Sequence, residues 1–235
     1  MTQPAGRPVS IGGRLAPRQL HFIWIVDCSA SMETDGKIEA LNNGIRDAIP
    51  HMRDVADRNP HAELMVRVIK FSTGAEWHVA QPTPIEQFRW ADLTAAGVTD
   101  LGKALKMVAA ELNESKMSAR ELKPVLALIS DGMPTDDFKG GLKELMAQTM
   151  GRKAKRVAIA IGRDVDIECL QKFIGNNEEK PIQAHETAEI AACIQYVSTA
   201  VVQEASQPKS RAVDGPKGQA TPPNLNSRQA NDITF

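Results

Sequence analysis

The pattern of apolar and polar positions divides the chain into alternating strands and helices. Short apolar runs, typical of buried strands, alternate with segments in which apolar residues recur every three or four positions, as on one face of a helix. The expected strands cover about 21–26, 64–71, 76–79, 125–130 and 156–161, with a weak strand near 181–184. The expected helices cover about 38–55, 101–112, 138–146, 167–174 and 188–204.

Two features of these elements predict the architecture. The strands are nearly continuous apolar runs, which is typical of parallel strands covered on both faces. The runs 64–71 and 76–79 instead flank a turn at 72–75, which predicts an antiparallel hairpin. We therefore expect an α/β fold with a doubly wound, mostly parallel central sheet, one antiparallel edge hairpin and helices on both faces. Such sheets bind ligands beyond the carboxyl ends of their strands.

The two ends of the chain differ in composition from the segment between them. Residues 1–17 are rich in Gly, Pro and Arg and are interpreted as a flexible arm, and residues 18–205 form the predicted domain. Residues 206–235 contain several prolines among polar residues and no large apolar cluster. A segment that buries so little apolar surface does not offset its ordering entropy, so we expect a disordered tail.

Composition excludes several classes of partner. The chain of 235 residues is 42% hydrophobic and 4% aromatic, which supports a mainly aliphatic core. Its formal charge of -1 provides no global attraction to nucleic acid or an acidic membrane, so we expect neither as a partner. The apolar run Phe22–Val26 is far shorter than the ~20 residues of a membrane span. The first residues also lack the apolar middle of a secretion signal, so we expect a cytoplasmic protein.

Three widely spaced cysteines, Cys28, Cys169 and Cys193, complete the composition. No Cys-x-x-Cys pair occurs, and no histidine lies at zinc-ligand spacing from a cysteine. We interpret all three as buried free thiols rather than as a zinc site.

Oxygen-bearing side chains follow two predicted strands and precede one helix. Asp27, Ser29 and Ser31 lie at alternate positions directly after the first strand, and Asp131 follows strand 125–130. Thr99 precedes the helix that begins near Leu101. Carboxylate and hydroxyl oxygens are hard donors of the kind that Mg²⁺ accepts.

In this order, Asp-x-Ser-x-Ser, the threonine loop and Asp-Gly resemble the metal-ion-dependent adhesion site (MIDAS) of von Willebrand factor A (vWA) domains, which have a Rossmann-like fold. The resemblance implies that Ser29 and Ser31 bind Mg²⁺, or alternatively Mn²⁺, directly. It implies that Thr99 is a direct or switching ligand and that Asp27 and Asp131 act mainly through water. A partner protein would supply an Asp or Glu to the open metal position. Alone, each piece has a plainer explanation, as a turn or a helix cap.

The loop 93–105 and the run Asp131–Asp136 look like those of TerY-type bacterial proteins. Those proteins are linked to tellurite resistance and stress response. They are often encoded beside a protein kinase and a PP2C-type phosphatase. This resemblance implies a non-catalytic, Mg²⁺-dependent protein-interaction module, with the kinase and phosphatase as candidate partners. One departure is that some relatives carry a cysteine-rich tail, whereas no cysteine follows Cys193.

Two other functions stay open. The first is a metal-dependent phosphohydrolase, which also needs an acid after the first strand. Against it, haloacid-dehalogenase-type enzymes place a second Asp where this chain has Ser29. In addition, no lysine is obviously positioned to orient a phosphate. A regulatory vWA subunit of an AAA-type ATPase complex is the third hypothesis. Because the chain has no P-loop, the ATP chemistry would then belong to a partner.

Several further residues lie near the same predicted end of the sheet. Met32 and Met133 follow the two acidic loops and suit either core packing or partner contact. The remaining acids there are interpreted as solvated loop residues; they are Asp35, Asp100, Asp136 and Asp137.

Overall fold

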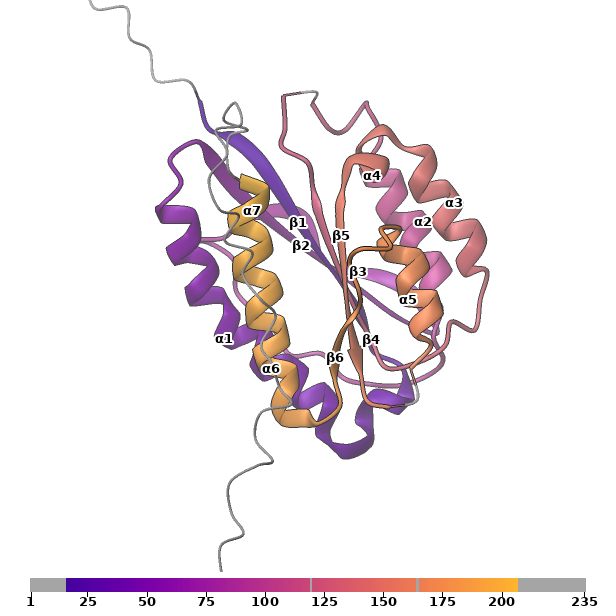
Figure 1. The fold of residues 1–235 in the computed structure, drawn as a ribbon. Coiled ribbons are helices and arrows are strands. Elements are labelled where there is room, and N and C mark those ends of the chain that lie inside the picture. Colours follow the sequence, from indigo (N-terminus) through magenta and orange to yellow (C-terminus); the bar gives the residue numbers. More distant parts are fainter. Residues whose placement is uncertain (1–15, 119, 164, 207–235) are drawn as a thin grey trace, which may run out of the picture.

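The computed structural model describes residues 16–118, 120–163 and 165–206, which form one six-stranded sheet with helices on both faces (Figure 1). The strands are β1 (Arg18–Asp27), β2 (Ala62–Ser72), β3 (Gly74–Pro84), β4 (Val125–Ser130), β5 (Lys155–Ile161) and β6 (Ile182–Ala184). The helical segments are η1 (Ala30–Gly36), α1 (Lys37–Asp57), α2 (Leu101–Glu111), α3 (Phe138–Ala147), α4 (Thr149–Lys153), α5 (Ile167–Ile174), α6 (Thr187–Tyr196), η2 (Val197–Val201) and α7 (Val202–Ser206).

The order of the strands in the sheet is β3-β2-β1-β4-β5-β6. All neighbouring strands pair in parallel except β3, which is antiparallel to β2 at one edge. The predicted fold class is therefore confirmed. β3 continues through Pro84, beyond the predicted strand 76–79, because an edge strand tolerates residues that lack a backbone N–H.

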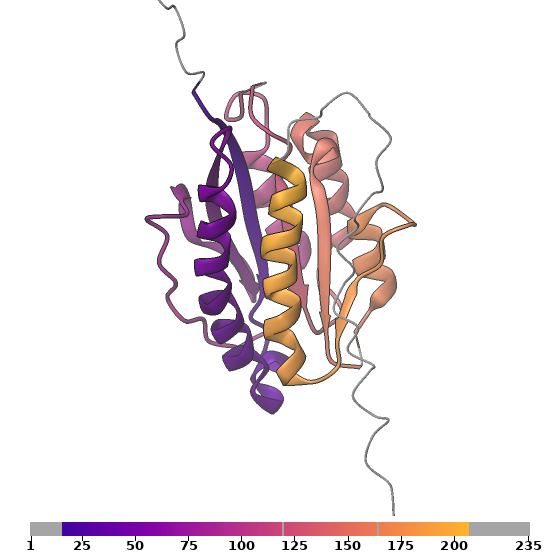
Figure 2. The same cartoon turned by 60° about the vertical axis from the view of Figure 1, so that its left-hand side comes forward.

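Helices cover the two faces of the sheet in separate layers. Figures 1 and 2 show α1, α6 and α7 on one face and α2, α3, α4 and α5 on the other. Successive residues of β1 alternate between the two cores: Phe22 and Trp24 pack with the α1 and α6 layer, whereas Ile23 and Ile25 pack with the α2 and α3 layer. Burial on both faces explains why the strands are apolar without interruption.

Three helical segments differ from the prediction. The 3₁₀ segment η1 and the short helix α4 were not expected, and the final helix contains the π-helical turn η2. At this turn Ser198 Oγ donates to Ile194 O at 2.5 Å, and Thr199 Oγ1 donates to Gln195 O at 2.8 Å. These hydroxyls compete with backbone donors for carbonyls one turn earlier, which is consistent with the local change in helix type.

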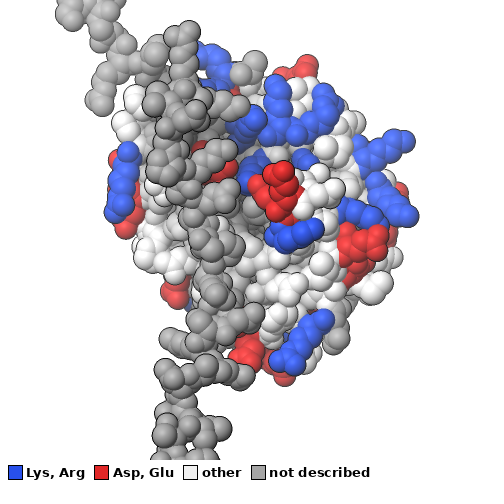
Figure 3. Space-filling view, in the orientation of Figure 1, with Lys and Arg blue, Asp and Glu red and all other residues white. Residues whose placement is uncertain are grey.

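The predicted arm (1–17) and tail (206–235) lie outside the described residues except at positions 16, 17 and 206. No helix of the described ranges is long and apolar enough to cross a membrane. Figure 3 shows basic and acidic side chains interspersed on one face of the molecule, as expected for a net charge of -1.

All three cysteines are buried and free, as predicted. Burial raises the pKa of the Cys28 thiol to about 12, and the charge of Asp27 contributes to the same shift. Burial likewise raises the pKa of Cys169 to about 12 and that of Cys193 to about 11. These thiols are therefore protonated at neutral pH and poorly reactive.

Candidate metal centre

The five predicted site residues meet at the carboxyl ends of adjacent strands. Asp27 ends β1 and Asp131 follows β4, and these strands pair directly. The loop before α2 is tied to the loop after β1, since Ala96 N donates to Cys28 O at 2.8 Å and Ala30 N donates to Gly97 O at 3.1 Å. We refer to Asp27, Ser29, Ser31, Thr99 and Asp131 as the hydroxyl cluster.

Asp27 is fully buried and both of its carboxylate oxygens accept hydrogen bonds. Ser29 N donates to Oδ1 at 2.8 Å, and Ser130 Oγ donates to Oδ2 at 2.5 Å. Burial raises the pKa of Asp27, hydrogen bonds from Ser130 and Ser29 oppose that shift, and the charge of Asp131 adds to it. The carboxylate therefore holds the turn that presents the serines.

The two serine hydroxyls are spaced as neighbouring metal ligands would be. Ser29 Oγ lies 3.0 Å from Ser31 Oγ. In an octahedron with Mg²⁺–oxygen distances of about 2.1 Å, adjacent oxygens lie about 3.0 Å apart. Ser31 Oγ also donates to Asp131 Oδ1 at 2.8 Å, so the acid orients this hydroxyl.

Thr99 approaches the serines from the loop before α2. Its N–H donates to Thr135 Oγ1 at 3.1 Å and its carbonyl accepts from Thr135 N at 2.9 Å. A Cβ built on Gly132 would lie 3.6 Å from Thr99 Oγ1 and 4.0 Å from Ser31 Oγ. The two hydroxyls therefore border the same space above Gly132, which a side chain at this position would fill.

Thr99 does not cap the following helix. The first N–H groups of α2 are instead accepted by Asp136, with Gly102 N at 2.7 Å from Oδ1 and Lys103 N at 2.8 Å from Oδ2. The Thr99 hydroxyl is thus left for the hydroxyl cluster.

Asp131 has a second partner that the sequence did not predict. Lys37 Nζ donates to Asp131 Oδ2 at 2.7 Å, and the Asp131 side chain is 0% exposed. Lys37 is the first residue of α1, where the helix dipole disfavours a positive charge. That unusual position is the one sequence signal that could have identified it.

Three of the acids interpreted as solvated have defined structural roles, and the expectation was wrong for Asp100, whereas Asp137 is exposed with a side chain 69% accessible. Asp100 is buried and accepts from Gly74 N at 2.7 Å and from Lys103 Nζ at 2.6 Å. The hydrogen bond from Lys103 is the main cause of a lowered Asp100 pKa. Asp136 caps α2, and Asp137 caps α3 by accepting from Gly140 N at 2.9 Å. Sequence patterns alone do not show which helix end an acid reaches across a loop.

Exposed apolar residues neighbour two members of the hydroxyl cluster in the chain. Val98, next to Thr99, is 46% exposed, and Met133, two residues after Asp131, is 64% exposed. Met32 is instead fully buried in the core. The two methionines that follow the acidic loops therefore differ, one packing inside and one facing solvent.

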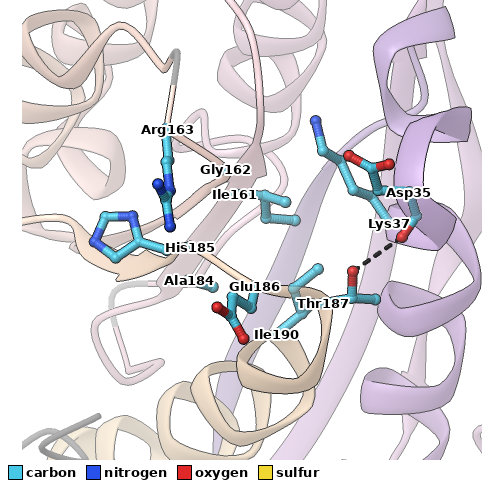
Figure 4. A pocket seen from close by; sticks show the side chains of 10 residues that line it. All are labelled: Asp35, Lys37, Ile161, Gly162, Arg163, Ala184, His185, Glu186, Thr187 and Ile190. Atoms are coloured by element: carbon cyan, nitrogen blue, oxygen red, sulfur yellow. Dashed lines mark hydrogen bonds between the residues drawn. The ribbon is translucent and has the colours of Figure 1, made fainter. Parts of the chain in front are cut away.

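A cavity of about 400 Å³ lies beside the cluster, at the ends of β5 and β6 (Figure 4). Asp35 and Lys37 line one side of it, and Arg163 and His185 line the opposite side. Thr187 Oγ1 donates to Asp35 O at 2.9 Å, which ties the start of α6 to the segment before Lys37. Lys37 thus borders both this cavity and the hydroxyl cluster.

These observations fit a hard divalent cation. The described part of the chain contains no group of three or more His, Cys, Asp or Glu side chains that could hold a metal. In the hydroxyl cluster the donors would be the hydroxyls of Ser29, Ser31 and Thr99. As direct ligands, neutral hydroxyls would themselves cancel none of the ion's charge. A bound Mg²⁺ would supply a positive centre to which an anionic oxygen can bind.

A comparison with protein families identifies the domain. The family model described as von Willebrand factor type A domain matches residues 23–195. The chain belongs to the von Willebrand factor A domain family. A search of curated protein sequences gave no significant match.

Solved vWA structures share the fold at low identity. The ArnB paralog VWA2 from Sulfolobus acidocaldarius is 15% identical, with a TM-score of 0.56 over 77% of this chain and 45% of that one. A vWA protein from Catenulispora acidiphila is 15% identical, with a TM-score of 0.58 over 78% and 42%. Proximal thread matrix protein 1 from the mussel byssus, described with a zinc-occupied MIDAS motif, is 14% identical, with a TM-score of 0.62 over 80% and 49%. The chain spans less than half the length of each of these three.

Proposed function

We propose that this vWA domain is a non-catalytic, Mg²⁺-dependent protein-interaction module. The observation that carries the proposal is the hydroxyl cluster, in which the Ser29 and Ser31 oxygens are 3.0 Å apart and both carboxylates are engaged in hydrogen bonds. In this proposal Ser29, Ser31 and Thr99 hold the ion, Asp27 and Asp131 orient the hydroxyls or bound water, and a partner's Asp or Glu completes the coordination.

The surface around the cluster supports a protein partner. Of the large apolar side chains in the described ranges, Val98, Met133 and Ile167 are exposed, and the first two lie within two residues of Thr99 and Asp131 in the chain. Apolar side chains beside a metal-bound carboxylate add contact area that a single small ligand would not use. A zinc-occupied MIDAS in proximal thread matrix protein 1 supports divalent binding by this kind of site. Hard hydroxyl donors favour Mg²⁺ or Mn²⁺ here.

The partner and setting follow from the resemblance to TerY-type proteins. We propose that the module acts in the bacterial cytoplasm, in a tellurite-resistance, stress-response or kinase–phosphatase signalling system. A protein kinase and a PP2C-type phosphatase are the candidate partners. The loop 93–105 and the run Asp131–Asp136 are the segments that carry this resemblance.

The decisive experiment measures metal binding first and partner binding second. Isothermal titration with Mg²⁺ is expected to show one site in the wild type and none in Asp27→Ala or in Ser29→Ala/Ser31→Ala. Asp47→Ala removes an exposed acid on α1 and serves as the control that keeps binding. Pull-down of the purified kinase and phosphatase should then require Mg²⁺ and fail in EDTA. Capture that persists in EDTA would refute the proposed function.

A further inference from the structure

Lys37 supplies a positive charge inside the candidate metal centre. Its ammonium lies 2.7 Å from Asp131 Oδ2, and its side chain is only 20% exposed. Ser31 Oγ holds the other oxygen of the same carboxylate at 2.8 Å. Asp131 is thus fixed from both sides, by a hydroxyl that faces the metal position and by an ammonium.

The surrounding backbone holds Lys37 in this place. Gly36, which precedes it, has a φ of 68°, and the Thr187 hydroxyl binds the carbonyl of Asp35. A Cβ on Gly162 would lie 3.6 Å from Lys37 Nζ, so the ammonium packs close to the end of β5. A positive charge at a helix N-terminus is disfavoured, so a specific interaction, here with Asp131, must offset that cost.

Charge balance indicates what Lys37 does when metal is bound. The two carboxylates of the cluster, Asp27 and Asp131, would balance a divalent ion completely. Asp100 lies nearby but has its own counter-charge in Lys103, at 2.6 Å. Lys37 therefore leaves the loaded site with one net positive charge, which favours an anionic oxygen as the last ligand.

We propose that Lys37 is a specificity-determining residue that weakens metal binding by the empty site and strengthens capture of a carboxylate by the loaded site. The inference rests on the proposed function, since it assumes the metal site. It identifies the partner group as an anion and predicts that metal and partner bind cooperatively. Metal alone is held weakly, and the arriving carboxylate removes the repulsion from Lys37.

The experiment measures two ligands in the same variants. Lys37→Met keeps the aliphatic stem and removes the charge, Lys37→Gln does so with a polar end, and Lys37→Arg keeps the charge. We expect both neutral variants to bind Mg²⁺ about tenfold more tightly than wild type by isothermal titration. We expect the same variants, loaded with Mn²⁺, to bind acetate several-fold more weakly, measured by the loss of Mn²⁺-bound water in proton relaxation.

Controls separate this role from a structural one. Lys106→Met removes a more exposed ammonium from α2, with a side chain 41% exposed and paired only with exposed acids, and should change either affinity less than twofold. Lys37→Arg should resemble wild type. Circular dichroism confirms that each variant is folded.

The two affinities must change in opposite directions. If both neutral variants bind Mg²⁺ equally or more weakly than wild type, Lys37 only positions Asp131 and the inference is overturned. Tighter Mg²⁺ binding with unchanged acetate binding overturns it as well. Absence of Mg²⁺ binding by the wild type is a different result, because it removes the proposed function itself.

Discussion

Buried charged groups lie at both ends of the sheet, but their charges are balanced in different ways. Toward the amino end, His21, Arg67, Glu111 and Glu121 form what we call the amino-end cluster. Arg67 Nη1 lies 3.0 Å from Glu111 Oε2 and its guanidinium stacks 4.0 Å from the Trp77 ring, while His21 Nε2 lies 3.3 Å from Glu121 Oε2. The Arg67 guanidinium thus has an opposite charge within hydrogen-bond distance, while His21 is neutral at pH 7 because burial lowers its pKa.

The hydroxyl cluster at the carboxyl end has no such balance. Its two buried acids face three neutral hydroxyls, and Lys37 is the cation paired with one of them. Balanced charges stabilise a fold, whereas an excess of acid beside oriented hydroxyls is the environment that a cation requires. Burial of charge alone therefore does not distinguish a candidate metal site, whereas buried acids beside oriented hydroxyls do.

The largest expected effect concerns stability at the amino end. Arg67→Ala should lower the free energy of unfolding by about 3 kcal/mol, because it removes one partner of a buried ion pair and the stack on Trp77. Urea denaturation measures this loss. Lys116→Ala removes the exposed partner of the same Glu111 and should cost under about 1 kcal/mol. Similar losses in the two variants would contradict the distinction between balanced buried charges and surface charges.

The next effect tests the unbalanced end. Mg²⁺ at about 100 times its dissociation constant should stabilise the wild type by about 2.7 kcal/mol, because it binds only the folded state. Asp27→Asn should abolish this increment, since the amide no longer accepts hydrogen bonds from both Ser29 N and Ser130 Oγ. Lys116→Ala should retain it. Thermal unfolding with and without Mg²⁺ gives the comparison, and an increment that survives in Asp27→Asn would count against metal binding at this cluster.

A smaller effect is the pH dependence contributed by His21. Burial lowers its pKa from the ordinary 6.5, with a further contribution from Arg67, while Glu121 and Glu63 oppose the shift. The unfolded chain therefore takes up a proton at higher pH than the folded protein does. This contribution to stability is complete above about pH 7 and is lost as the pH falls through 6.5 toward the folded-state pKa.

His21→Gln should flatten the stability profile between about pH 7 and 5, measured by urea denaturation across that range. A profile that keeps the wild-type slope would assign the acid sensitivity to other groups.

The smallest expected effect is thiol reactivity. With the pKa of each cysteine raised to about 11 or 12, a thiol-specific chromogenic reagent should react negligibly with the native protein. After denaturation, Cys28, Cys169 and Cys193 should all react. Rapid reaction of one thiol in the native state would show that the segment carrying it opens locally.

Helices and strands could be predicted from the sequence where the same pattern of buried and exposed positions continues along the whole element. Helix α5 was predicted at its observed bounds because its apolar stripe is complete, and β4 because all six of its residues are buried. The 3₁₀ segment η1 and the π turn η2 were missed, since they depend on individual side-chain hydrogen bonds rather than on periodicity.

The same limit applies to the candidate site. Asp27, Ser29, Ser31, Thr99 and Asp131 could be selected from local motifs, and the structure brings them together. The partners of Ser130, Lys37 and Asp136 could not be predicted in this way, because each side chain reaches across the fold: Ser130 to Asp27, Lys37 to Asp131 and Asp136 to the start of α2. Such pairings depend on strand order, which the sequence did not define.

The close contact between α2 and α3 has a consequence for anyone who would transplant or redesign this domain. A Cβ on Gly102 would lie 2.4 Å from Asp137 O, and one on Gly141 would lie 2.4 Å from Gly102 O, so the two helices meet backbone to backbone. The loop that carries Thr99 leads into α2, and the loop that carries Asp131 leads into α3, so this helix contact fixes the two loops relative to each other. A redesign that moves one loop must therefore move the other with it.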